Sequence, residues 1–145
     1  MKATDVAKYV IDICYKNNIQ ISNLKLQKTL FFLWIDFYLE TKKSLFDDKI
    51  YAWPLGPVIP SIYREYCAYG SLPILPFGNE GSELLPITEE ETKLLDTLIK
   101  KYASMSAYNL VEKSHEGGSS WATTFRDGLG NKFEIPFALI KQLGK

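Results

Sequence analysis

NLKLQKTLFFLWIDFYLETK, residues 23–42, is apolar on almost every side when it is drawn as a helix with about 100° between residues. Ser22 stands directly before it, where a serine hydroxyl can accept a hydrogen bond from an unpaired N–H of the first turn. A helix that is apolar nearly all round packs in the interior of a fold. The sequence therefore predicts a central buried helix over about residues 23–42. Four polar residues of this helix share one arc about 60° wide: Lys25, Thr29, Asp36 and Glu40.

Five further segments show helical spacing of apolar residues or a helix start signal. They cover about residues 5–17, 60–70, 88–102, 106–115 and 137–143. Thr4 and Ser106 are predicted N-caps, and Pro60 suits the first helical position. Thr88 and Glu91 have the spacing of a capping box, in which each satisfies a backbone N–H of the other.

The remaining segments are short and irregular. Residues 50–53 and 132–135 are extended in character and predict at most one small β-hairpin. The part of residues 121–133 that precedes the second of these segments is expected to be irregular, with turns. Residues 71–86 are predicted to be a loop held against the body, because they include Leu72, Ile74, Leu75 and Phe77. The sequence shows no domain boundary, so we expect residues 1–145 to form one mainly α domain. It is predicted to be a compact single-domain bundle of about six helices around the central one.

Charge and composition exclude several classes of protein. The chain has 145 residues, with 17 Lys plus Arg and 17 Asp plus Glu, so its net charge is zero. A dedicated nucleic-acid binder usually shows a clustered basic face, so nucleic acid is an unlikely partner. The longest apolar block, Leu30–Leu39, is about half the roughly 20 residues of a membrane span and is interrupted by Asp36. Cys14 and Cys67 are far apart in sequence, which favours two reduced thiols in the core of a cytoplasmic protein.

The single histidine bears most on catalysis. His115 lies among Ser114, Ser119 and Ser120, so one hypothesis makes it the general base of a hydrolase. The alternative is that its charge and hydrogen bonds stabilise the end of the preceding helix. One histidine and two distant cysteines do not form a zinc set, and we expect no metal and no cofactor. The sequence favours a protein that is not an enzyme.

Two features are not explained by core formation. Gln27 and Lys28 interrupt the apolar surface of the central helix. Either Gln27 bonds a loop backbone while Lys28 extends to the surface, or the pair lies at the edge of a groove and serves a partner. The turn at Trp53–Pro60 contains three prolines and Gly56, which make it either a rigid corner or a preformed binding surface. We expect Gln27 to hydrogen-bond the backbone of this turn.

Several motifs resemble those of a known family. ISNLKLQK at 21–28, LFDDKIYAW at 45–53, GPVIPSIY at 56–63 and Tyr69-Gly70 resemble the Panacea domain of the GepA-like and SocA-like phage-associated antitoxins. The second half resembles the family more loosely, through residues 88–102, 106–115 and Trp121. Ser114 stands where the family has Thr before His, and Ser120 stands where it has Pro before Trp.

The resemblance implies the antitoxin of a type II toxin–antitoxin system, which neutralises a cognate protein toxin by direct binding. Its partner would then be the product of a neighbouring gene. In the SocA-like branch the antitoxin is similar to a proteolytic adaptor that delivers its toxin to a protease, and a DNA-binding regulator of its own operon is a third hypothesis. Nine residues are our candidates for the partner-binding surface: Gln27, Lys28, Trp53, Gly56, Pro57, Val58, Tyr63, His115 and Trp121.

Overall fold

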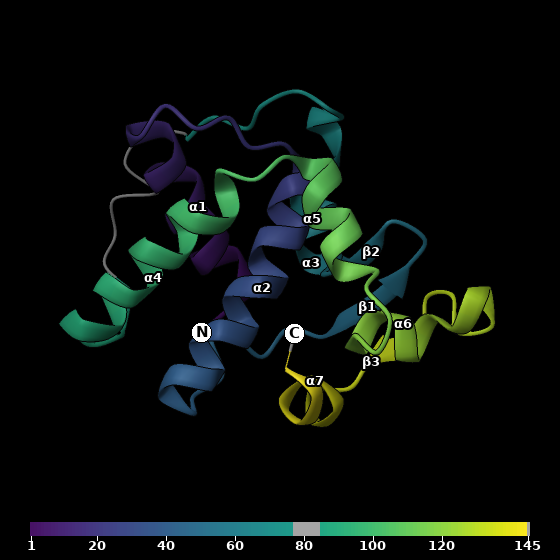
Figure 1. The fold of residues 1–145 in the computed structure, drawn as a ribbon. Helices are drawn as coiled ribbons and strands as arrows, with labels where there is room; N and C mark the ends of the chain where they lie inside the picture. Colours follow the sequence, from purple (N-terminus) through teal and green to yellow (C-terminus); the bar gives the residue numbers. More distant parts are fainter. Residues whose placement is uncertain (77–84, 145) are drawn as a thin grey trace.

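The computed structural model describes residues 1–76 and 85–144 and is mainly helical, as predicted (Figure 1). Its α-helices are α1 (Ala3–Lys16), α2 (Asn23–Thr41), α3 (Pro60–Tyr66), α4 (Glu89–Ala103), α5 (Ala107–Ser114), α6 (Ser120–Phe125) and α7 (Phe137–Leu143). Two 3-10 turns are η1 (Cys67–Tyr69) and η3 (Arg126–Gly128). The described part thus contains the six predicted helices, and α6 is an additional one.

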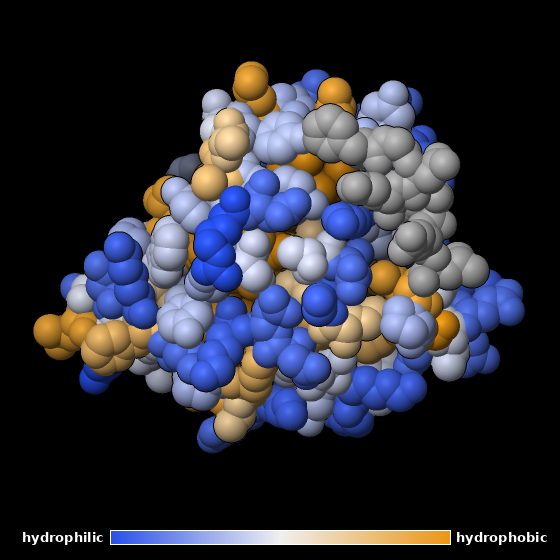
Figure 2. All heavy atoms as spheres, turned by 180° about the vertical axis from the view of Figure 1, so that it is seen from behind, coloured by the Kyte–Doolittle hydropathy of each residue, from blue (hydrophilic) through white to orange (hydrophobic). Residues whose placement is uncertain are grey.

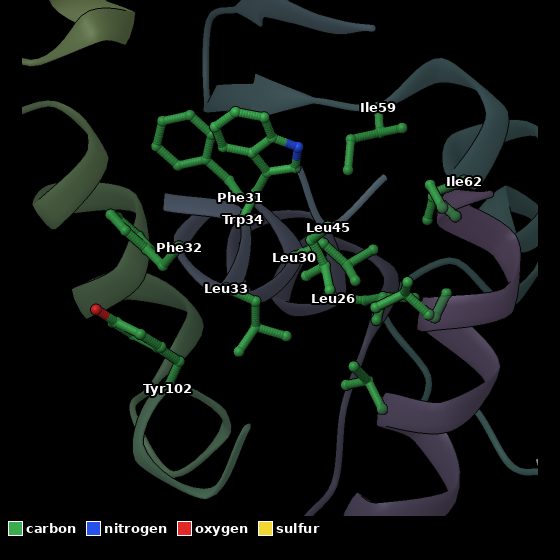
Figure 3. Packing of buried hydrophobic residues seen from close by; sticks show 14 of the residues in the cluster. Leu26, Leu30, Phe31, Phe32, Leu33, Trp34, Leu45, Ile59, Ile62 and Tyr102 are labelled. Carbon is green, nitrogen blue, oxygen red and sulfur yellow. The ribbon is translucent and has the colours of Figure 1, made fainter. Parts of the chain in front are cut away.

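Helix α2 is the centre of the fold, which confirms the prediction. It packs against α1, α3, α4, α5 and α7, and against the sheet. Figure 3 shows Phe32 of α2 beside Tyr102 of α4, with Leu26, Leu30 and Leu33 of α2 in the same buried cluster. The Ser22 hydroxyl accepts the Lys25 N–H at 3.3 Å, so the predicted N-cap is present. Because neighbours surround it, this helix needs no exposed polar face.

The polar arc of α2 is accordingly not an exposed strip. Thr29 and Asp36 are buried, because α4 and α5 pack against α2. The Tyr102 hydroxyl donates a hydrogen bond to the Asp36 carboxylate inside the protein. Lys25 is half-buried, and of the four only Glu40 is exposed. The helical projection correctly placed these four residues on one side of α2. It could not show that α4 and α5 cover most of that side.

The two segments predicted to be extended do form strands, and a third strand lies within the turn predicted at Trp53–Pro60. Strands β1 (Ile50–Trp53), β2 (Gly56–Val58) and β3 (Glu134–Ile135) are antiparallel, in the order β2-β1-β3. Trp53 pairs with Gly56, so only Pro54 and Leu55 connect β1 to β2. The sheet lies at the side of α2, where β2 contacts that helix (Figure 1).

The predicted N-cap of the first helix is wrong. Helix α1 begins at Ala3, and Lys2 occupies the N-cap position without a side-chain hydrogen bond. Its first N–H is instead satisfied from far along the chain, because the Asp48 carboxylate accepts the Ala3 N–H at 2.8 Å. Thr4 therefore lies inside the helix.

Two further expectations need correction. Cys14 is buried as expected, but Cys67 is exposed, because it lies in the short turn after α3 rather than on a core face. In the segment after η1, Ile74 is buried and its N–H donates to the Ile21 carbonyl at 2.8 Å, so the loop is held as predicted. Leu72 and Leu75, however, are exposed. Phe77 lies outside the described residues.

Among the described helices, none is long and apolar enough to cross a membrane.

The capping box of α4 gives a direct stability prediction. Thr88 Oγ1 accepts the Glu91 N–H at 3.1 Å, and the Glu91 carboxylate accepts the Thr88 N–H at 3.0 Å. Thr88→Ala should therefore lower the free energy of unfolding by about 1 kcal/mol. The control is Thr97→Ala, which removes an exposed threonine within the same helix and should be neutral or slightly stabilising. Urea unfolding measures both, and equal effects would contradict the capping role.

Candidate functional site

A groove of about 450 Å³ runs between α2, the β1–β2 hairpin and α3. Five of the nine predicted residues line it: Gln27, Lys28, Trp53, Val58 and Tyr63. The face seen in Figure 2 is mostly hydrophilic, with hydrophobic side chains in small patches. The fold thus brings together, in one groove, five predicted residues that lie between positions 27 and 63 of the sequence.

Gln27 and Lys28 hold the β2 strand against α2. Gln27 Oε1 accepts the Ile59 N–H at 2.8 Å, and Gln27 Nε2 donates to Asn23 Oδ1 at 3.3 Å. Lys28 Nζ donates to the Pro57 carbonyl at 3.0 Å. The bond predicted between Gln27 and the turn is confirmed. A sheet edge normally presents unpaired backbone groups, and here two of them are paired with helix side chains.

The expectation that Lys28 extends to the surface is wrong, since its exposed fraction is 0%. The backbone carbonyl of Pro57 and the close-packed Gly56 keep the side chain inside. Burial away from water lowers the pKa of the Lys28 ammonium to about 7, because the charged form loses hydration. Among the described residues no carboxylate forms an ion pair with it.

Gly56 permits this close packing. Its φ is +115°, a conformation that favours glycine. A Cβ on Gly56 would lie 2.7 Å from Ser114 Oγ and 2.9 Å from Lys28 Cε, both closer than real Cβ contacts. The hairpin can therefore approach α2 and α5 only with glycine at this position.

Trp121 and His115 support the hairpin from outside the groove. Trp121 Nε1 donates to the Trp53 carbonyl at 2.8 Å. The His115 ring stacks on Trp121, with centroids 3.8 Å apart and planes at 6°. Helix α5 ends at Ser114 with His115 as its C-cap, within one residue of the predicted end. Burial lowers the pKa of His115, and the positive charge of Lys28 lowers it further, against an opposing effect of Glu112.

Two of the three serines near His115 are hydrogen-bonded to backbone carbonyls. Ser114 Oγ donates to the Val111 carbonyl at 2.7 Å, and Ser119 Oγ donates to the Ser114 carbonyl at 2.9 Å. Ser120 Oγ and His115 Nε2 are buried without a hydrogen-bond partner. This arrangement favours a packing role for His115. Within the described residues, no cluster of three or more acidic, histidine or cysteine side chains could hold a metal.

The outer part of the groove is aromatic and apolar. The Trp53 and Tyr63 rings have centroids 5.1 Å apart and are tilted by 58°. Tyr63 is 41% exposed and Leu55, at the tip of the hairpin, is 58% exposed. Lys132 Nζ lies 5.5 Å from the centre of the Trp53 ring. These side chains present hydrophobic area to solvent on a fixed support.

Sequence reasoning missed Leu24, Leu55 and Cys67, which also line the groove. Leu55 had a signal, because a residue between Pro54 and Gly56 in a tight turn must lie at the tip. Leu24 had none, since an apolar residue on an almost wholly apolar helix looks like a core residue. The other four predicted residues pack behind the groove: Gly56, Pro57, His115 and Trp121.

Comparisons with known proteins identify the family of this chain. The family model described as "Antitoxin SocA-like, Panacea domain" matches residues 26–122, which include most of α2, the hairpin, α3 and Trp121. The Antitoxin SocA of Caulobacter vibrioides (strain NA1000 / CB15N) is 30% identical over 127 residues, covering 82% of this chain and 68% of that protein. No solved structure shows a significant match. The chain belongs to the SocA-like antitoxin family that is defined by the Panacea domain.

Proposed function

We propose that this chain is the antitoxin of a type II toxin–antitoxin pair and neutralises its cognate toxin by binding it directly. The observation that carries the proposal is the groove, a concave apolar surface whose Tyr63 and Leu55 side chains are exposed. Membership of an antitoxin family supports the role. The partner we propose is a protein encoded by a neighbouring gene, met in the cytoplasm.

The way in which the hairpin is held suits a binding surface. Its backbone is fixed by hydrogen bonds that Lys28 and Trp121 donate and by one that Gln27 accepts from the Ile59 N–H. A surface that is already ordered loses little conformational entropy on association, and Trp and Tyr are frequent anchors of protein interfaces. Because a standard interface buries about 800 Å² on each partner, toxin contacts would extend from the groove over α3 and the hairpin.

Truncating the exposed side chains of the groove tests the proposal. Tyr63→Ala and Leu55→Ala should each raise the dissociation constant for the toxin about tenfold or more, since anchor residues contribute more than 1 kcal/mol. Cells that express the neighbouring gene should then lose part of their rescue by this chain. Binding can be measured with purified toxin, and growth by co-expression.

Matched controls come from exposed residues of the same types outside the groove. Tyr108 and Leu129 are 69% and 78% exposed, so Tyr108→Ala and Leu129→Ala should leave neutralisation unchanged. Thermal melting of all four variants separates lost binding from lost folding. Full neutralisation by folded Tyr63→Ala and Leu55→Ala proteins would contradict the use of the groove.

The level of toxin protein in rescued cells distinguishes direct blocking of the toxin from its delivery to a protease. Direct blocking leaves the toxin at a constant level in rescued cells, whereas a proteolytic adaptor shortens its half-life. Pulse-chase labelling of the toxin, with and without this chain, measures the difference. Rapid loss of toxin that depends on this chain would replace blocking with the adaptor hypothesis.

A further inference from the structure

Strand β2 covers the side chain of Lys28. Although Lys28 belongs to the wall of the groove, its exposed fraction is 0%, because Gly56 and Pro57 of β2 lie directly on it. A Cβ on Gly56 would lie 2.9 Å from Lys28 Cε, and the Pro57 carbonyl accepts a hydrogen bond from Nζ at 3.0 Å. Ser114 Oγ of α5 lies at the same contact, 2.7 Å from that Cβ position. With this cover in place, the amine has no contact with water.

The cover is thin and weakly held. Strand β2 has three residues at an edge of the sheet, and its middle residue, Pro57, has no N–H to donate to β1. Two side-chain hydrogen bonds hold its backbone to α2, one from Lys28 and one from Ile59 to Gln27. Helix α5, in contrast, is anchored in the core by Leu110. Because an edge strand of this kind has few bonds to break, β2 can open while α2 stays folded.

The charge of Lys28 works against the cover. An ammonium has three N–H donors, and among the described residues this one has a single acceptor, the carbonyl on β2. The titratable side chains around it are His115 of α5, Tyr63 of α3 and Cys67 of η1, and Glu112 acts on His115. None of the described residues that line the groove is a carboxylate. Opening lets water solvate the ammonium, so protonation favours the open form.

We propose that β2 is a proton-controlled lid, which opens locally and whose open form is favoured when Lys28 is protonated. Val58 of β2 lines the groove, so opening changes the shape of the groove. Acidification therefore lowers the share of chains in which the groove is complete. The inference concerns the free chain and does not rest on the proposed function.

The direction of the pH effect follows from proton linkage. The pKa of Lys28 is about 7 under the closed lid, because burial disfavours the charged form, and about 10.4 for a lysine in water. Between these values the open form binds more protons. The closed form is therefore most stable at high pH and loses stability as the pH falls toward 7. Below pH 7 Lys28 is protonated in both forms, and its contribution is constant.

Chemical labelling of the wild-type chain tests the lid. Acetic anhydride acetylates exposed lysine amines, so Lys28 reacts only while its cover is open, and mass spectrometry measures the rate. Alkylation of Cys14 by iodoacetamide is the matched control, since this thiol is 0% exposed and lies on α1, outside the groove. Global unfolding exposes both side chains, whereas the lid exposes Lys28 alone. Up to about 1 M urea, acetylation of Lys28 should stay constant while alkylation of Cys14 accelerates.

The pH dependence gives a second result. The protection factor of Lys28 is the acetylation rate of a lysine in an unstructured peptide divided by that of Lys28. It should fall at least about tenfold between pH 8.5 and pH 7. Hydrogen exchange locates the motion, because the Ile59 N–H on Gln27 should exchange faster than the amides of α5.

Three outcomes would each overturn the inference: equal urea sensitivity of Lys28 and Cys14, a protection factor that is constant between pH 8.5 and pH 7, or slower exchange at Ile59 than in α5. Toxin rescue is measured separately, so neutralisation can stand while the lid fails.

Discussion

Gly56→Ala is expected to lower the free energy of unfolding by about 2–5 kcal/mol and the melting temperature by roughly 10 °C. Two costs combine. The positive φ of +115° is strained for a residue with a Cβ, at about 1–2 kcal/mol. The new methyl group would also lie against Ser114 Oγ and Lys28 Cε, and overpacking a core of this kind costs about 1–3 kcal/mol.

Loss of groove geometry should accompany the loss of stability. To relieve the contact, the hairpin must move away from α2 and α5, which would disturb the bond from Lys28 to Pro57. Toxin binding is therefore expected to weaken even at temperatures where the variant is folded. The control is Gly117→Ala, whose Cβ has no neighbour within 4 Å and whose φ is not positive. Chemical denaturation of both variants checks the prediction, and equal stability would contradict it.

The family, the central helix and the first strand of the groove-lining hairpin could be predicted because each has a local signal. The α2 segment is apolar on nearly all sides and residues 50–53 are extended in character, whereas the prolines around Gly56 indicated a turn where the structure has strand β2. Gln27 could be assigned a backbone partner because a buried amide must be hydrogen-bonded. This inference requires only the hydrogen-bonding needs of the Gln27 amide, and the structure shows that the Ile59 N–H is its backbone partner.

Other features depend on contacts that no local pattern encodes. Lysine usually places its charge in water, but Lys28 lies under a hairpin held close by Gly56, so its side chain stays buried. The N–H of Ala3 is bound by a carboxylate 45 residues away, which made Thr4 a false cap. Helix α6 has six residues, too few to show a period, although Ser119 caps it at 3.0 Å from the Ala122 N–H.

The burial of Lys28 should make the free energy of unfolding depend on pH. Because the Lys28 side chain is completely buried, the folded protein bears the cost of removing its ammonium from water. That cost should depend on pH, because a neutral amine is far easier to bury than a cation. The pH dependence of unfolding therefore measures the cost directly, without a partner.

The free energy of unfolding of the wild type, relative to Lys28→Met, should rise by about 2–3 kcal/mol between pH 7 and pH 9. The pKa of Lys28 is about 7 in the folded protein and about 10.4 in an unfolded chain, so between these values the unfolded state binds more protons. Each pH unit in this window then adds about 1.4 kcal/mol to the stability of the wild type. Below pH 7 both states are protonated and the difference is constant.

The comparison with Lys28→Met isolates this effect from other groups. Burial raises the pKa of the Cys14 thiol to about 11, which lowers stability as the pH rises above about 8.5 in both proteins. The pKa of His115, which faces Lys28, is lowered below its ordinary value, so this ring is already neutral in the window. Urea titrations of both proteins at half-unit pH steps measure the difference. A difference that stays constant from pH 7 to pH 9 would show that Lys28 keeps an ordinary ammonium in the folded state and would contradict the prediction.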